Sequence, residues 1–402
     1  MSLRIALAVA ATALGGCASQ TFINDVDFLS RHTEVIVLQP DRTQYARIAV
    51  CPALQGRVMT SSAAGEGGLS YGWINRDLIA SGEKRKHINA FGGEDRFWLG
   101  PEGGQFSVFF AKGDPQDLPH WQTPAAIDSE PFDVARRTVD TVLLRKRMKL
   151  VNASGTTFEL ELQREIRTLA GNDPGKMLGI QPPSDVRWVG YESRNKVTNT
   201  GDKEWKRESG LLSAWILGMY NPSTATTVVI PYKDGPEDKL GPVVNDAYFG
   251  KVPADRLRIA PGVVYFKGDG LRRSKIGVSP RRSLGVLGSY DAENETLTVV
   301  QFRIPKGVTD YVNSMWEQQK EPFAGDAANS YNDGPAAAGQ APMGPFYELE
   351  SSSPALALKP GIAYTHVQTT FHFQGPVEAL DMIAVRVFGV TLEQITGAFG
   401  NR

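Results

Sequence analysis

The sequence is poor in the residues that build covalent and metal scaffolds. Its 402 residues include only 2 cysteines and 5 histidines. With so few cysteines, we expect neither a disulfide framework nor a thiol-based zinc site. The histidines form no His-x-His or HExxH pattern, so no metal site is predicted. We expect no cofactor either, because the glycine spacing does not follow a strand and open a helix, as a dinucleotide-binding motif requires.

An excess of charge of one sign is also missing. Lys and Arg number 43 and Asp and Glu number 44, which gives a formal net charge of −1. Such a chain has no global positive field to hold a polyanion, so we exclude nucleic acid as a partner. With 41% apolar and 22% charged residues, the composition also excludes a disordered chain and a polytopic membrane protein.

What the sequence has is an excess of turn residues, 41 Gly and 25 Pro, and many alternating stretches. Residues 157–162 read Thr-Phe-Glu-Leu-Glu-Leu, which puts apolar side chains on one face of a strand and carboxylates on the other. Further strands are expected at 142–151, 210–220, 226–231, 263–267, 284–290, 296–304 and 363–373. Helices are expected only at 376–385 and after a capping box that begins at Thr391. These patterns predict an all-β protein with few short helices.

The N-terminal residues have the pattern of an export signal. Arg4 precedes an apolar run, residues 5–16, which is too short to span a bilayer as a mature helix. The run ends in Leu-Gly-Gly-Cys at 14–17, which resembles the lipobox of bacterial lipoproteins, where the cysteine is acylated. An ordinary secretory signal that contains a cysteine is the alternative. Cys51, in a strand-like apolar run, would then have no partner and is expected to be buried.

The lipobox interpretation defines the expected domains and localisation. We expect a signal peptide over 1–16, a tether over 17–30 that is lipidated at Cys17, and one domain over 31–402. Ala and Ser follow Cys17 with no Asp, which favours the outer membrane. The sequence therefore predicts a protein of the bacterial cell envelope that faces the periplasm and contacts the membrane through its lipid.

The C-terminal residues carry a family resemblance. The chain reads Tyr-Glu-Leu-Glu at 347–350, Leu-Lys-Pro-Gly at 358–361, Tyr-Thr-His at 364–366 and Phe-His-Phe at 371–373. This order resembles the end of the galactose mutarotase-like (aldose 1-epimerase) superfamily, in which a Leu-Glu strand bears the catalytic carboxylate. Looser matches lie at 71–76, 91–98 and 198–201. The resemblance implies a β-supersandwich whose concave sheet binds carbohydrate.

The resemblance also implies roles for single residues. Glu350 matches the carboxylate that takes the proton of the anomeric hydroxyl, and Arg76 lies in the first of the looser matches. The two positions of the family's histidines hold Phe91 and Thr200. Ordinary epimerase chemistry therefore lacks its acid, and His87, four residues before Phe91, is the candidate substitute.

The segment 87–104 is the richest in residue types that bind sugars. Sugars are held by planar bidentate hydrogen-bonding groups and by an aromatic face against their C–H surface. We therefore predict Glu94, Arg96, Trp98 and Glu102 as substrate-binding residues. The alternative is a turn-rich connection with an internal Glu–Arg salt bridge.

Other charged and polar groups leave two interpretations each. Glu348 and Glu350 share a strand face, either as an acid–base pair or as two solvated carboxylates. Asn332 and its neighbours in the irregular segment 323–345 form either a lid over a sugar or a mobile surface loop. The basic cluster at 272–282 is interpreted as a solvated face; if it lined the cleft, it would favour a uronic acid or a sulfated sugar.

The sequence leaves three functions open. The first is a lipoprotein that binds carbohydrate, with the question of whether it also catalyses a reaction on a glycan left open. The second is an enzyme, either an aldose epimerase or a glycoside hydrolase or lyase, that uses Glu350. The third is a structural envelope lipoprotein. His366 and His372 are about 20 Å apart on an extended strand and are expected to be structural.

Overall fold

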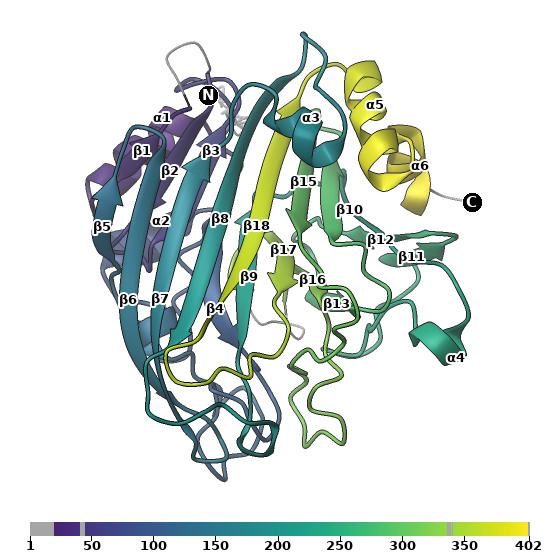
Figure 1. Ribbon diagram of the computed structural model, residues 1–402. Helices are drawn as coiled ribbons and strands as arrows, with labels where there is room; N and C mark the ends of the chain where they lie inside the picture. Colours follow the sequence, from purple (N-terminus) through teal and green to yellow (C-terminus); the bar gives the residue numbers. More distant parts are fainter. Residues whose placement is uncertain (1–19, 41–44, 336–338, 340, 401–402) are drawn as a thin grey trace, which may run out of the picture.

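Three antiparallel sheets account for most of the chain (Figure 1). The computed structural model describes residues 20–40, 45–335, 339 and 341–400. Strands make up 37% and helices 14%, so the predicted all-β class with few short helices is confirmed. The expected signal peptide, Cys17 and the first residues of the expected tether lie outside the described residues. The expected division into domains otherwise stays a prediction.

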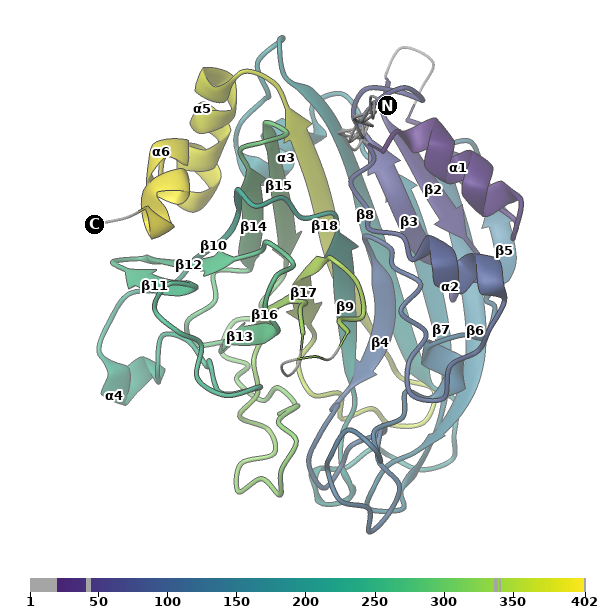
Figure 2. The same ribbon diagram turned by 180° about the vertical axis from the view of Figure 1, so that it is seen from behind.

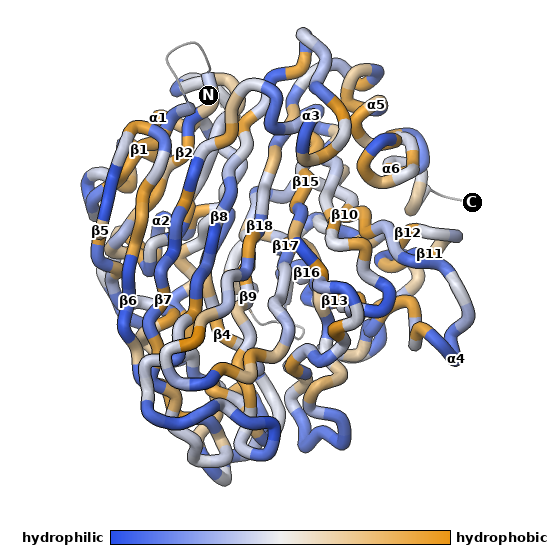
Figure 3. Tube along the Cα trace, viewed as in Figure 1, coloured by the Kyte–Doolittle hydropathy of each residue, from blue (hydrophilic) through white to orange (hydrophobic). Residues whose placement is uncertain are grey.

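The largest sheet has ten strands and contains most of the strands that the sequence predicts. In spatial order these are β11 (Leu257–Ala260), β12 (Val263–Lys267), β10 (Thr226–Pro231), β14 (Val286–Asp291), β15 (Thr296–Phe302), β18 (Ala363–Gln374), β8 (Arg187–Asn199), β7 (Thr157–Thr168), β6 (Thr141–Val151) and β5 (Asp133–Arg137). The tight turn between β6 and β7 contains Gly155, whose φ of 90° favours glycine. Figure 3 shows hydrophilic and hydrophobic residues alternating along β6 and β7, as a sheet with one buried face requires.

A five-stranded sheet packs against the inner face of the ten-stranded sheet (Figure 2). Its strands, in spatial order, are β13 (Ser274–Val278), β16 (Ala328–Asn332), β17 (Tyr347–Ser352), β9 (Ser213–Tyr220) and β4 (Arg96–Gly100). Buried side-chain hydrogen bonds join the two sheets, among them Ser351 to His366 at 2.8 Å. The interpretation of residues 323–345 as a loop is wrong for β16, which pairs with β13 and β17.

The N-terminal residues form a smaller layer. The sheet of β1 (Ile36–Leu38), β2 (Arg47–Cys51) and β3 (Arg57–Ser62) is accompanied by α1 (Phe22–Ser30) and α2 (Arg76–Ser81). The expectation of a tether up to residue 30 is wrong from residue 20 on, because Phe22, Phe28 and Leu29 of α1 are buried. Cys51 is buried beside Phe28 and Leu29, as predicted.

The remaining helices are short. α3 (Asp173–Leu178) and α4 (Glu237–Leu240) lie in segments that the sequence shows as irregular. α5 (Val377–Phe388) and α6 (Leu392–Thr396) pack on the outer face of the ten-stranded sheet near β10 and β14, and the predicted capping box at Thr391 is present. Single 3₁₀ turns are η1 (Ala125–Ile127), η2 (Arg207–Ser209) and η3 (Gly397–Phe399). In the described part of the chain no single helix could span a membrane by length and composition, although the bent pair α5 with α6–η3 passes that test together.

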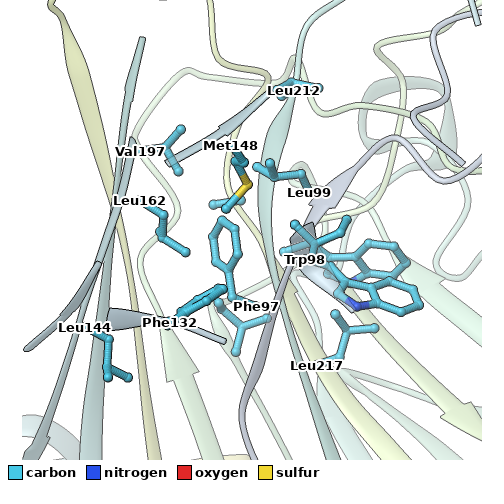
Figure 4. Close-up of a cluster of buried hydrophobic side chains, with 14 of the residues drawn as sticks. Phe97, Trp98, Leu99, Phe132, Leu144, Met148, Leu162, Val197, Leu212 and Leu217 are labelled. Carbon is cyan, nitrogen blue, oxygen red and sulfur yellow. The ribbon is translucent and has the colours of Figure 1, made fainter. Parts of the chain in front are cut away.

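The core between the sheets defines which side of β4 is free for a site. Figure 4 shows Phe97 on the side of β4 that faces Phe132 and Leu144, whereas Trp98 and Leu217 lie on the opposite side. Because side chains alternate along a strand, Arg96 shares the side of Trp98. The outer face of the five-stranded sheet therefore carries a row of large polar and aromatic residues.

Candidate functional site

The strand pairing of the five-stranded sheet places residues from distant parts of the sequence on one face. Lys275, Tyr331, Glu348 and Met219 are cross-strand neighbours in one row. The next row contains Glu350, Leu217 and Arg96, and the row after it contains Trp215 and Trp98. Residues two apart on a strand point to the same face, so these side chains all lie on the outer face of the sheet.

A cavity of about 190 Å³ lies over this face. Its aromatic wall consists of Trp98, Trp121, Trp215 and Trp316 together with Phe249 and Tyr331. The tryptophans form one cluster, with ring centroids 5.6 Å apart for both Trp98–Trp215 and Trp121–Trp316. Trp121 and Trp316 belong to no strand or helix. Irregular segments thus close over what would otherwise be an open sheet face.

Charged groups line the same cavity. They are Arg96, Arg273, Lys275, Glu102, Glu348 and Asp333. Arg96 Nη2 donates to Glu348 Oε1 at 2.8 Å, and the guanidinium lies 4.2 Å from the centre of the Trp98 ring. Within the described residues, Nε and Nη1 of Arg96 have no hydrogen-bond partner. Arg96 therefore stacks on an aromatic ring, pairs with a carboxyl and still has two nitrogens free to donate to a ligand.

Glu350 lies next to the cavity and is fully buried. Lys275 Nζ donates to its Oε2 at 3.0 Å, and Trp215 Nε1 donates to the same oxygen at 2.9 Å. Its other oxygen, Oε1, has no partner in the described part of the chain. Glu350 does not line the cavity, whereas Glu348, two residues earlier, does.

Burial changes the acid–base behaviour of these carboxyls. Burial raises the pKa of Glu348 to about 8; Arg96 opposes this rise and the neighbouring Glu350 adds to it. Two interacting carboxyls titrate as a pair, and this pair retains a proton at neutral pH. Burial also raises the pKa of Glu102, to which the Trp316 indole donates. The cavity therefore holds a carboxylic acid that can donate a proton near pH 7.

Asp326 is a further buried acid, and it interacts electrostatically with the Lys275–Glu350 ion pair. Tyr248 donates to Asp326 Oδ2 at 2.6 Å, and Asn245 donates to the same oxygen at 3.3 Å. The Tyr248 ring also lies 5.5 Å from Lys275 Nζ. Burial raises the pKa of Asp326 to about 6.

Three of the sequence-predicted binding residues, Arg96, Trp98 and Glu102, line the cavity. The predicted catalytic residue Glu350 lies two residues after Glu348 on β17, next to the cavity but not in its lining. The expectation of two solvated carboxylates is wrong, because both are buried. The interpretation of the basic cluster as a solvated face is also wrong for Arg273 and Lys275.

Arg76, Glu94 and Asn332 are predicted substrate-binding residues that do not line the cavity. Arg76 pairs with Asp25 of α1 at 2.6 Å. Glu94 is buried between the sheets, where His372 Nε2 lies 3.1 Å from its Oε2. Asn332 is fully buried at the end of β16, so it is part of the sheet and not of a lid. All three have structural partners, and their direct contact with a ligand stays a prediction.

The histidine that would complete an epimerase is not found at the cavity. His87, the predicted acid, has Nδ1 2.6 Å from the backbone oxygen of Trp121 and does not line the cavity. Phe91 packs with Arg57 over its ring, and Thr200 donates its backbone N–H to the carbonyl of Glu159. His87 therefore contacts the segment that carries Trp121, and its role as an acid stays a prediction.

Sequence reasoning missed Trp121, Trp215 and Trp316 as site residues, and it included Arg273 and Lys275 only in the alternative that the basic cluster lines the cleft. Trp215 becomes identifiable only through its register with Trp98 on β4. Trp121 and Trp316 lie in segments without periodicity, so no pattern indicated their direction. For Glu348 the signal was present, since it shares a strand face with Glu350.

A second hollow, of about 560 Å³, lies beside Tyr71, His372 and Asp291. Its acids already have partners: Asp291 accepts from Asn294 at 2.7 Å, and Asp269 pairs with Arg256. In the described ranges no group of three or more His, Cys, Asp or Glu side chains could hold a metal ion. The tryptophan-lined cavity thus combines unused donors, a protonated acid and aromatic faces.

Comparisons with known proteins place the chain in a family. Among curated proteins none matches the sequence. Solved structures similar to this chain include the Slr1438 protein of Synechocystis, with 14% identity, a TM-score of 0.49, and coverage of 86% of this chain and 96% of that one. A galactose mutarotase-like protein of Lactobacillus casei has 10% identity, a TM-score of 0.47 and coverage of 84% and 100%.

A further similar structure is a galactose mutarotase related enzyme of Lactobacillus acidophilus, with 11% identity, a TM-score of 0.45 and coverage of 85% and 97%. A family profile matches nearly the whole described chain, residues 20–399. The chain therefore belongs to DUF6786, a family of unknown function.

Proposed function

We propose that this protein binds a carbohydrate in the tryptophan-lined cavity. The observation that carries the proposal is the combination of four indole rings with charged hydrogen-bonding groups in one cavity. An indole face suits the C–H surface of a sugar ring, and an arginine with unused donors suits its hydroxyl groups. Arg96, which is stacked on Trp98, provides both in one place.

Proton transfer to the bound sugar is a second candidate, and the raised pKa of Glu348 favours it. A carboxylic acid that retains its proton at neutral pH can donate it to a ring oxygen or to a glycosidic oxygen. Glu348 lines the cavity and is the group that would touch the sugar. Glu350, held by Lys275, would act through Glu348 as a positioning residue.

Binding is tested by calorimetry with the full chain and a panel of monosaccharides and oligosaccharides. We expect Trp98→Ala to weaken binding by about tenfold or more, a loss of about 1.4 kcal/mol, because it removes an aromatic face on which the C–H surface of the sugar would pack. Trp188→Ala is the matched control, since Trp188 packs on Phe371 in another part of the fold. Failure of the unaltered protein to bind any sugar, on a glycan array as well, would refute the proposal and favour a structural envelope protein.

Catalysis is tested separately by polarimetry of monosaccharide mutarotation and by assays of glycoside cleavage. Glu348→Gln preserves the shape of the side chain but cannot donate the proton, so it should abolish the activity. Glu350→Gln should lower the rate and shift the alkaline limb of the pH profile, which an unmodified Glu348 places near pH 8. If the unaltered protein shows no rate above buffer, the catalytic candidate fails while sugar binding stands.

We propose, in addition, that the protein acts in the bacterial cell envelope as a lipoprotein anchored through Cys17. The support is the lipobox-like sequence alone.

A further inference from the structure

Arg273 is a cation at the cavity wall without an anionic partner. It directly precedes β13, and its guanidinium lies 3.9 Å from the centre of the Phe249 ring. Within the described part of the chain, no hydrogen bond or ion pair of the Arg273 side chain is present. Asp333, an acid that also lines the cavity, accepts instead from the Tyr331 hydroxyl and the Gly344 backbone. Phe249 therefore positions a charge that Asp333 and Glu102 feel electrostatically but that no carboxylate among the described residues pairs with.

The neighbouring cations of the basic cluster have partners. Arg282 donates to the backbone oxygens of Lys233, Gly235 and Gly241 and thereby holds a loop. Lys275 is paired with Glu350. Arg273 thus differs from Arg282 by its place at the cavity, and from Lys275, which also lines the cavity, by donors that no carboxylate among the described residues occupies.

Arg96 adds to the positive character of the cavity. Its partner Glu348 retains a proton at neutral pH because it is buried, and two of the arginine nitrogens have no partner among the described residues. The side chain is only 3% exposed. A cation so far from water gains more from an anionic ligand than a surface arginine does.

From these contacts we propose that the sugar bound in this cavity is acidic, bearing a carboxylate or a sulfate, and that Arg273 recognises its charge. The proposal rests on the proposed function and names the class of its ligand. A planar guanidinium binds either anion through two parallel hydrogen bonds. A neutral sugar would leave the Arg273 guanidinium without a directly paired anion in the cavity.

The test uses matched sugars that differ in one group. The purified full chain is titrated by calorimetry with glucose, glucuronate and glucose 6-sulfate, and with galactose and galacturonate. We expect at least one acidic sugar to bind about tenfold more tightly than its neutral counterpart, which corresponds to about 1.4 kcal/mol. Glucuronate and glucose 6-sulfate distinguish a carboxylate ligand from a sulfate ligand.

Two variants assign the preference to Arg273. Arg273→Met retains an unbranched side chain against Phe249 and should remove the tenfold preference for the acidic sugar. Arg272→Met is the matched control, because that neighbouring side chain is exposed and does not line the cavity. Equal binding of neutral and acidic sugars would overturn the inference and leave sugar binding intact, as would a preference that survives Arg273→Met. If no sugar binds, the proposed function itself fails.

Discussion

The Lys275–Glu350 ion pair gives the sharpest prediction about stability. Lys275 is 6% exposed and Glu350 is not exposed at all, and 3.0 Å separates Nζ from Oε2. Replacing Lys275 by Met retains the length and most of the apolar stem of the side chain. The substitution therefore removes the charge and the hydrogen bond with little loss of packing.

The loss in the free energy of unfolding is set by the Glu350 carboxylate, which stays buried when Lys275 is replaced. In Lys275→Met the Glu350 carboxylate keeps only the Trp215 indole as a donor, because Oε1 has no partner among the described residues. Removing one member of a buried ion pair costs about 3–5 kcal/mol, since the other charge stays buried without compensation. Removing one member of an ion pair at the surface would cost less than about 1 kcal/mol. The measured loss of stability therefore distinguishes a buried ion pair from an exposed one.

The assay is guanidinium unfolding at pH 7 of the unaltered protein, the single variant and the double variant Lys275→Met/Glu350→Gln. Glutamine can still accept from Trp215 but carries no charge, so the double variant should recover at least half of the loss. A single variant that loses less than about 1 kcal/mol would refute the reasoning. A double variant no more stable than the single one would show that lost packing, and not the unpaired charge, is responsible.

Two further predictions concern a buried acid and the N-terminus. Burial raises the pKa of Asp326 from 3.8 to about 6, so its contribution is fully present below pH 4 and is lost as the pH rises through 6, by about 3 kcal/mol. Asp326→Asn should therefore gain stability relative to the unaltered protein between pH 4 and pH 7.5 in guanidinium unfolding, and parallel pH curves would contradict this. Cys17→Ser should move the expressed protein from the membrane fraction to the soluble fraction and abolish labelling with a radioactive fatty acid. A variant that still fractionates with the membrane would argue against lipidation.

The strands of the ten-stranded sheet could be predicted because each has its own alternating pattern of apolar and polar residues. β10 and β12 have the bounds expected from the sequence, and the β6–β7 hairpin pairs two of the expected strands. Alternation is strong wherever one face meets the core and the other meets water. The helix α1 was missed because its burial depends on contacts with residues far along the chain, among them Cys51 and Phe91.

The candidate site was predicted in part for a related reason. Arg96, Trp98 and Glu102 are close in sequence, so their local density was visible. Their partners Trp215 and Glu348 are more than a hundred positions away and meet them only through the order β17-β9-β4. No pattern in a single segment encodes that order.

The interpretation of Glu348 as solvated shows where sequence reasoning fails most instructively. On an antiparallel sheet, the face that carries charged residues usually meets water, and β17 indeed has charges at alternate positions. Here irregular segments that carry Trp121 and Trp316 cover that face. The cover removes water, and the missing water raises the pKa of Glu348 and leaves two nitrogens of Arg96 without a hydrogen-bond partner among the described residues. The segments without periodicity, and not the strands beneath them, therefore turn an open sheet face into a cavity lined by tryptophans.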